Sequence, residues 1–317
     1  MRKSNRQLGF ADALVEQVSK PNMKLDRIER LVDWRAVEAL LRPLRSAPTG
    51  RPGYQPLPML KALLLQQWYG LSDPGLEEAL ADRLSFRRFL GVSLQDETPD
   101  HTTLWRFRED LVRLGLAERV FAAIARQFEQ NGLVLRQGTL IDATLIPAAV
   151  RPSGSAEQPS DPDAAFARRA GEPGSTFGFK AHVAMDQGSG LVRAAVLTPA
   201  NVNETTVADR LVQGDEAAVY ADMAYDSKAR RVALKRRGIK DRIMHRPNKH
   251  HPVLAPWPAR RNRLIARVRG RVETAFAVAK WHYGWRRARY RGLPRNQAHL
   301  HLLCTAINLR RAIAITA

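Results

Sequence analysis

Apolar residues recur at helical spacing in several short stretches of the N-terminal part of the chain. Leu25 and Ile28 begin the first of these stretches, and Ser72 and Pro74 stand at a position typical of a helix start. This pattern predicts helices at residues 25–48, at 58–69, from 73, from 98, and at 112–131. We therefore expect residues 1–132 to form an all-helical domain.

The pattern changes near residue 138, where short apolar runs bounded by turn residues replace the helical spacing. These runs predict five strands at 140–146, 177–186, 191–198, 217–222 and 239–245. Helices are predicted between and after them at 203–212, 227–237, 260–281 and 295–313, and a Pro-rich loop at 147–176. The order predicts an α+β or α/β domain over residues 133–317, with a mixed five-stranded sheet flanked by helices.

Composition excludes several classes of protein. The chain has 317 residues, of which 44% are hydrophobic, which is ordinary for a globular protein. Its one cysteine, Cys304, rules out an internal disulfide framework and a zinc site built from cysteines. No run of about 18 apolar residues suggests a membrane span, and the N-terminus lacks the apolar core of a secretory signal. We therefore expect a cytoplasmic location.

The net charge of +20 is concentrated in residues 225–317, which contain 24 Lys and Arg but only 3 Asp and Glu. Arginine accounts for 19 of these basic residues, and its guanidinium matches the geometry of phosphate oxygens. This distribution predicts a nucleic-acid partner, although a ribosome-like or merely solubilising basic segment is the alternative. Aromatic residues interleave the arginines, which suits a groove that follows a nucleic-acid backbone but is equally compatible with core packing: Trp257, Trp281, Tyr283, Trp285 and Tyr290.

Three acidic residues are candidates for the chemistry. Asp142 lies inside an apolar strand, Asp222 ends another, and Glu273 is the sole acid between Asp241 and the C-terminus. Each alone is compatible with a structural role, because a buried carboxylate or a carboxylate among arginines can simply be paired. Together they provide the oxygen ligands that Mg²⁺ prefers, and two such ions can clamp both oxygens of a phosphoryl displacement.

The predicted helix around Glu273 carries cations on the same face. Arg269 lies four residues before Glu273 and Lys280 seven residues after it, so all three share one helical face. This face would present a metal ligand flanked by two groups for phosphates, whereas a solvent-exposed charged face is the alternative interpretation.

Four stretches resemble the insertion-sequence transposases with an Asp-Asp-Glu triad, in the branch named after insertion sequence five. These are LIDAT (140–144), FGFKAH (177–182), YADMAY (220–225) and the segment 269–280. The resemblance implies an RNase H-like domain in which Asp142, Asp222 and Glu273 hold two Mg²⁺, or Mn²⁺ in their place. It also implies contacts of Arg269 and Lys280 with DNA.

The same resemblance implies a function and partners. The expected activity is metal-dependent nicking at transposon ends followed by strand transfer into target DNA. The partners would be double-stranded DNA with terminal inverted repeats, target DNA and a second copy of the chain, at the nucleoid of a bacterium. The helical domain 1–132 would bind DNA or dimerise, although plain helical packing is an equal explanation for it. Two alternatives stay open: a non-catalytic DNA-binding descendant of a transposase, and a metal nuclease without strand transfer.

Further basic residues are secondary candidates for DNA contacts. Lys180 and His182 alternate on the second predicted strand and could face a phosphate, although His182 could instead be a satisfied core histidine. Arg271, beside Arg269 on the same helix, is a third candidate. The histidines His245, His250 and His251 lie among Pro and Lys and fit a basic loop facing DNA better than a metal site.

Overall fold

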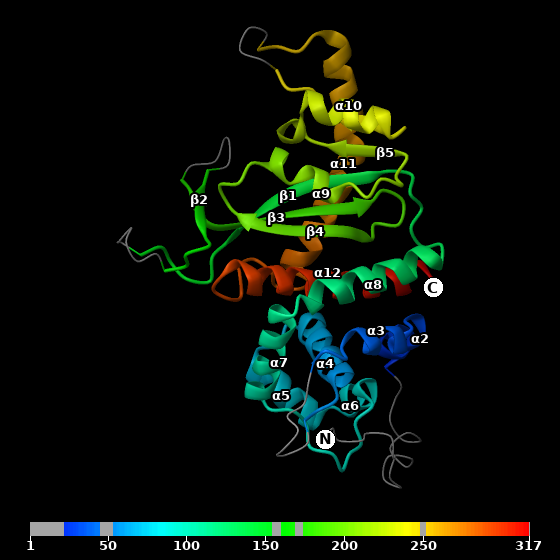
Figure 1. Ribbon diagram of the computed structural model, residues 1–317, viewed down its shortest axis with the longest axis vertical. Coiled ribbons are helices and arrows are strands. Elements are labelled where there is room, and N and C mark those ends of the chain that lie inside the picture. The colour runs from blue at the N-terminus through cyan, green and yellow to red at the C-terminus, as the bar shows by residue number, and fades with distance from the viewer. Residues whose placement is uncertain (1–21, 45–52, 154–159, 169–173, 248–251, 317) are drawn as a thin grey trace. The chain divides into compact units, whose positions relative to one another are not determined.

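The computed structural model describes residues 22–44, 53–153, 160–168, 174–247 and 252–316 (Figure 1). The chain divides into two compact units, one made of Met1–Gln127 with His301–Ala317 and the other of Phe128–Leu300. The second unit therefore ends earlier than the expected extent of 133–317. Physically, the last residues pack on the helical unit, where the Trp68 indole donates a hydrogen bond to the Ala306 carbonyl at 2.9 Å.

The first unit is built from helices, as the apolar spacing predicts. Their bounds are α2 (Met23–Leu31), α3 (Trp34–Leu40), α4 (Pro56–Tyr69), α5 (Asp73–Asp82), α6 (Leu84–Leu90), α7 (His101–Arg113), α8 (Leu116–Gln130) and the end of α12 (Leu293–Ile315). The single helix predicted at 25–48 is wrong, because Asp33 caps a new helix by accepting hydrogen bonds from the Arg35 and Ala36 amides. Among the described residues, none of the helices has the length and apolar character needed to cross a membrane.

The second unit contains one mixed sheet with helices against it. The strands are β1 (Thr139–Pro147), β2 (Ala165–Ala167), β3 (Thr176–Asp186), β4 (Val192–Pro199), β5 (Ala218–Ala221) and β6 (Lys240–Ile243). Their order is β2-β3-β1-β5-β6, with β4 paired to β3. The predicted count of five strands is therefore wrong by one. The sixth strand, β2, lies in the segment predicted as a loop, because three residues there pair with β3 without any alternating apolar pattern.

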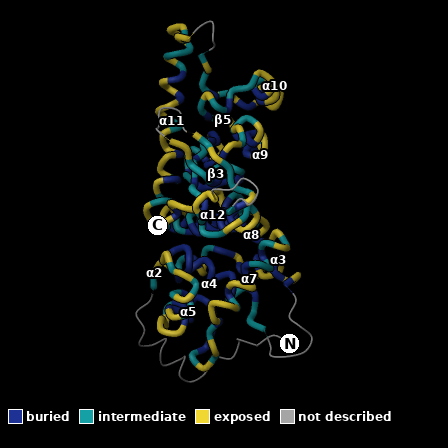
Figure 2. The backbone as a smooth tube through the Cα atoms, turned by 90° about the vertical axis from the view of Figure 1, so that its left-hand side faces the viewer, coloured by how far each residue is buried: buried dark blue, intermediate teal, exposed yellow. Residues whose placement is uncertain are grey.

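Helices cover both faces of this sheet. On one face, α11 (Pro256–Trp281) packs Val272 against Leu140 of β1 and Met185 of β3. On the other face, Ile141 belongs to a core with α9 (Ala208–Leu211) and α10 (Lys228–Arg236). Figure 1 shows α11 running behind the strands, and Figure 2 shows exposed and buried stretches alternating along it. Successive residues of β1 therefore point alternately towards α11 and towards α9.

Strands β1 and β5 are parallel but pair over only two positions, Thr139 with Val219 and Leu140 with Tyr220. Leu140 and Tyr220 both pack in the cluster under α11, so they share that face of the sheet. Beyond this pair the two strands are no longer bonded to each other. Two residues after this pair stand Asp142, which is still in β1, and Asp222, which directly follows β5. The alternation of side chains along β1 gives Asp142 the orientation of Leu140.

Leu140 should be essential to this face of the sheet. Replacing it by alanine removes a fully buried side chain under α11 and should destabilise the protein by about 2–5 kcal/mol in urea unfolding followed by circular dichroism. The matched control is Val232→Ala on α10, where the side chain is 49% exposed and little loss is expected. Equal losses for the two variants would contradict the packing described above.

Candidate active site

A pocket of about 290 Å³ lies where β1 and β5 separate. Its lining combines carboxylates, cations and a tyrosine from the strands and the connections after them. The residues are Asp142, Ala143, Thr144, Leu145, Ala167, Arg168, Lys180, Glu204, Asp222 and Tyr225. Two of the three sequence-predicted acids, Asp142 and Asp222, thus open onto one pocket.

Asp142 is held by a cation from the helix behind the sheet. Its side chain is 15% exposed, and its Oδ2 atom lies 3.1 Å from an Nη atom of Arg269 on α11. Its Oδ1 atom accepts a hydrogen bond from the Ala143 amide at 2.9 Å. Burial raises the pKa of Asp142 to about 6, against the opposing effect of Arg269. The Asp222 and Glu273 charges raise this pKa further, so all three predicted acids act electrostatically on one site.

Asp222 and Glu273 occupy different settings. Asp222 follows β5 and is partly buried, and its Oδ1 atom caps the short helix η2 (Met223–Tyr225) by accepting a hydrogen bond from the Ala224 amide at 2.7 Å. Glu273 lies on α11 next to the buried Val272 and is exposed. Over the described ranges, no group of three His, Cys, Asp or Glu is close enough to hold a metal ion. The structure thus brings Asp142 and Asp222 into one pocket, whereas Glu273, on α11, is not among the residues that line it.

The donor chemistry of the pocket nevertheless suits a divalent cation. Carboxylate oxygens from Asp142 and Asp222 are hard ligands of the kind that Mg²⁺ selects. The guanidinium of Arg269 neutralises Asp142 in this conformation, and its Nε atom is buried without a hydrogen-bond partner among the described residues. A cation therefore already balances the charge where a metal ion would bind.

The remaining predicted DNA contacts fall into two groups. Lys280 points to β1, where its Nζ atom donates to Thr144 Oγ1 at 2.7 Å, and Arg271 is exposed on α11. Lys180 lies in the pocket and binds Glu204 at 2.7 Å, with its side chain 12% exposed. Lys180 and Lys280 are thus tied to pocket groups, whereas Arg271 faces outward.

His182 takes the core position that was one of its two interpretations. Its side chain is fully buried, with Nε2 3.1 Å from Thr198 Oγ1 and Nδ1 3.5 Å from the hydroxyl of Tyr225. Burial, aided by the Lys180 charge, lowers the pKa of His182 to about 4. A neutral, enclosed imidazole cannot reach a DNA phosphate in this conformation, so we assign it no DNA contact.

Sequence reasoning missed Glu204 and Tyr225. Tyr225 stands in the YADMAY motif, but only the fold shows that its side chain turns back against His182 and lines the pocket. Burial and the charges of Asp142 and Asp222 raise its pKa, which keeps the phenol protonated. Glu204 follows β4 by five residues and carried no motif signal of its own.

Of the three histidines predicted to form a basic loop, His250 and His251 lie outside the described residues. His245 is described and follows β6. Its amide donates to Asn262 Oδ1 at 2.9 Å, and its ring lies 6.2 Å from that of Trp257. These contacts tie the end of β6 to the first turns of α11.

Two family models match most of the chain. A transposase DDE domain model matches residues 135–309, and a transposase domain of a second family (DUF772) matches residues 12–110. Because the first match covers more than half of the chain, the protein belongs to the family of transposases with a DDE catalytic domain. It is accordingly a DNA transposase, a divalent-metal-dependent enzyme that cuts DNA and transfers strands.

Among solved structures, the chain is similar to a piggyBac transposase described as a synaptic complex with hairpin DNA, determined by cryo-electron microscopy. The identity is 9%, the TM-score is 0.44, and the match covers 96% of this chain and 77% of that one.

Stability should depend on pH through His182. In the unfolded chain the His182 imidazole is protonated below about pH 6.5, whereas in the folded protein it stays neutral down to about pH 4. The free energy of unfolding therefore decreases as the pH falls through this window. The contribution of His182 to this loss between pH 7 and pH 5 should be about 2 kcal/mol. His182→Gln should remove this part of the pH dependence in urea unfolding, and the exposed His282→Gln should retain it. The same pH profile for both variants would show that His182 is not the responsible group.

Proposed function

We propose that residues 128–300 form an RNase H-like catalytic domain in which Asp142, Asp222 and Glu273 hold two Mg²⁺ ions, with Mn²⁺ as a substitute. The observation that carries this proposal is the register of β1 and β5: Leu140 pairs with Tyr220, and each is followed two residues later by one of the aspartates. The Glu273 charge raises the pKa of Asp142, as the Asp222 charge does, and this supports the inclusion of Glu273.

The bound ions would supply an activated attacking oxygen and neutralise the leaving oxygen. The residues of the chain would arrange the DNA around them. Arg269 balances Asp142 in this structure, and its guanidinium would also bind a phosphate oxygen of the DNA. Lys280 on the same helix would hold a phosphate beside Thr144. Lys180 would present a third cation to the pocket once its bond to Glu204 opens.

The substrate would be double-stranded DNA carrying terminal inverted repeats, followed by target DNA. Hydrolytic nicking at the ends would free a 3′-hydroxyl, which would attack the target directly. The helical unit would contribute end recognition or dimerisation, and a homodimer would pair two ends. We place this activity in the bacterial cytoplasm, at the nucleoid.

The triad can be tested by isosteric replacement. Asp142→Asn, Asp222→Asn and Glu273→Gln should each lower end nicking and strand transfer at least about 100-fold, because each removes a negatively charged oxygen ligand. DNA binding measured without divalent ions should stay within a few-fold of the wild type. Omission of Mg²⁺ should abolish both reactions of the wild type.

Asp226→Asn serves as the matched control, because Asp226 lies four residues after Asp222 but binds Arg231 at 2.8 Å and does not line the pocket. Full activity of any triad variant would remove that residue from the site. A pre-cut end that is not joined to target DNA by the wild type would indicate that joining needs components beyond this chain.

Arg271 offers a test of the exposed basic face of α11. If it neutralises one phosphate, Arg271→Ala should reduce the slope of log K against log salt for duplex binding by about 0.9. Fluorescence anisotropy over a range of salt concentrations measures this slope. An unchanged slope would place Arg271 outside the DNA interface.

A further inference from the structure

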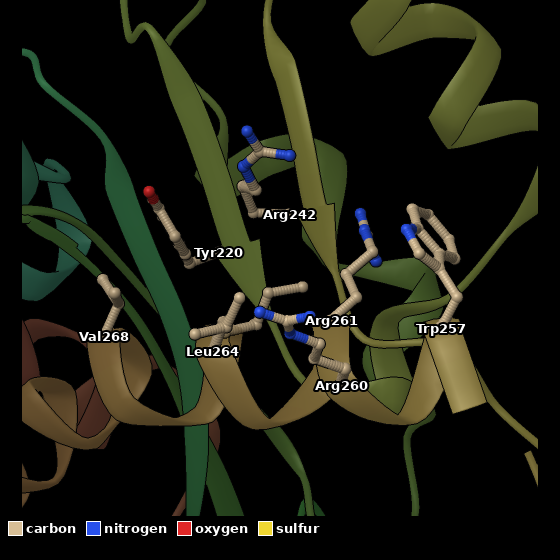
Figure 3. A pocket seen from close by; sticks show the side chains of 8 residues that line it. Tyr220, Arg242, Trp257, Arg260, Arg261, Leu264 and Val268 are labelled. Carbon is tan, nitrogen blue, oxygen red and sulfur yellow. The ribbon is translucent and has the colours of Figure 1, made fainter.

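A second and larger pocket, of about 550 Å³, lies between β5, β6 and the first half of α11. Figure 3 shows Tyr220 and Arg242 extending from the strands and the other labelled side chains rising from the helix opposite. The helix contributes residues at intervals of three or four, from Trp257 at one end to Val268 at the other. The lining is Tyr220, Arg242, Trp257, Arg260, Arg261, Leu264, Ile265 and Val268.

The charges of this pocket select an anion. Three arginines and no acidic residue line it. Arg261 is anchored, because its guanidinium donates to the backbone carbonyls of Ile243 and Asp241 and lies 3.7 Å from the Asp241 carboxylate. The side chains of Arg242 and Arg260 are exposed and have no ion-pair partner within the described ranges, so their charges are available to a ligand.

The apolar part of the pocket selects a flat or apolar group. Trp257 is 68% exposed and Leu264 is 55% exposed. Leaving two large apolar side chains in water is unfavourable, and exposed apolar side chains of this kind often mark a binding site. Tyr220 adds a second aromatic ring from β5. An indole beside two available guanidinium groups is the combination that binds a nucleic-acid base together with its phosphates.

The pocket shares no lining residue with the candidate active site, but α11 and β5 connect the two. Val268 at its end precedes Arg269, which binds Asp142, and Tyr220 on β5 stands two residues before Asp222, which follows the strand. A strand that leaves the active site along α11 would therefore meet Val268, then Leu264, and then Trp257. This path follows one helix of one compact unit.

We propose that this second pocket binds an unpaired nucleotide of a DNA strand, with its base against Trp257 and Leu264 and its flanking phosphates on Arg242 and Arg260. The proposal rests on the proposed function, because it assigns the path of a strand that continues from the carboxylate pocket. A base that is paired and stacked within a duplex would have to unstack before its ring could contact Trp257. The pocket therefore prefers single-stranded or locally opened DNA to intact duplex.

Fluorescence anisotropy tests this assignment. It measures the binding of the full chain, without divalent ions, to a fluorescein-labelled single-stranded oligonucleotide and to the matching blunt duplex. Trp257→Ala should weaken single-strand binding about 5- to 100-fold and change duplex binding less than about twofold. Trp257→Phe should restore most of the loss. The combined Arg242→Ala and Arg260→Ala variant should reduce the salt slope for the single strand by about 1.4, or about 0.7 for each phosphate contact.

The matched control is Trp281→Ala, at the other end of α11, where the indole is 71% exposed but is covered on one face by Arg286 at 4.0 Å. Equal losses for the Trp257 and Trp281 variants would overturn the proposal, as would equal losses on single strand and duplex. An acidic peptide provides a further test. The proposal would also be overturned if the peptide displaced the labelled oligonucleotide from the wild type, but not from Trp257→Ala, at a concentration where an unlabelled oligonucleotide of equal charge does not. That result would assign the pocket to a protein partner.

The outcome is separable from that of the catalytic proposal. A protein that binds single strands through Trp257 but does not cut in Mg²⁺ would contradict the proposed triad and support the pocket. A protein that cuts, but whose Trp257→Ala variant binds as the wild type does, would support the triad and overturn the pocket.

Discussion

The ion pair between Asp142 and Arg269 is the interaction on which the site depends. A carboxylate in the middle of a strand between two helix-covered faces would be costly if its charge were unbalanced. Arg269 supplies that balance from α11, and the same helix packs Val272 on the neighbouring Leu140. Helix and strand are therefore held together by an apolar contact and an ionic one, side by side. The raised pKa of Asp142 shows that the ionic contact does not fully offset burial.

This helix organises more than the catalytic pocket. Its C-terminal half binds β1 through Arg269 and Lys280, and its N-terminal half forms one wall of the pocket that contains Trp257. One helix thus connects the carboxylate pocket, whose donors suit a divalent cation, with the arginine-lined pocket, which suits an anion. The many arginines in the C-terminal part of the chain have two roles here. Some arginines, such as Arg261, fasten the helix to the end of β6, and others remain available to a polyanion.

Regular spacing made most of the fold predictable, because apolar periodicity reports local structure directly. It predicted most of the helices, although α2 and α3 were predicted as one, and five of the six strands. Strand β2 has three residues and no alternating pattern, so only its pairing with β3 reveals it. Within the site, motif spacing predicted Asp142 and Asp222. Glu204 and Tyr225 could not be found in this way, because their place depends on how segments distant in sequence fold back on the sheet. The burial of His182 depends on Thr198 and Tyr225 for the same reason.

The brevity of β5 has a consequence for sequence change in this family. Asp222 stands directly after a strand of four residues, and side chains alternate between opposite faces along such a strand. Insertion or loss of one residue within it would turn the carboxylate away from α11 and towards the α9 side, while leaving the composition of the chain almost unchanged. The number of residues in β5 is therefore constrained more strictly than their identity, and substitutions there should be tolerated far more readily than an insertion or a deletion.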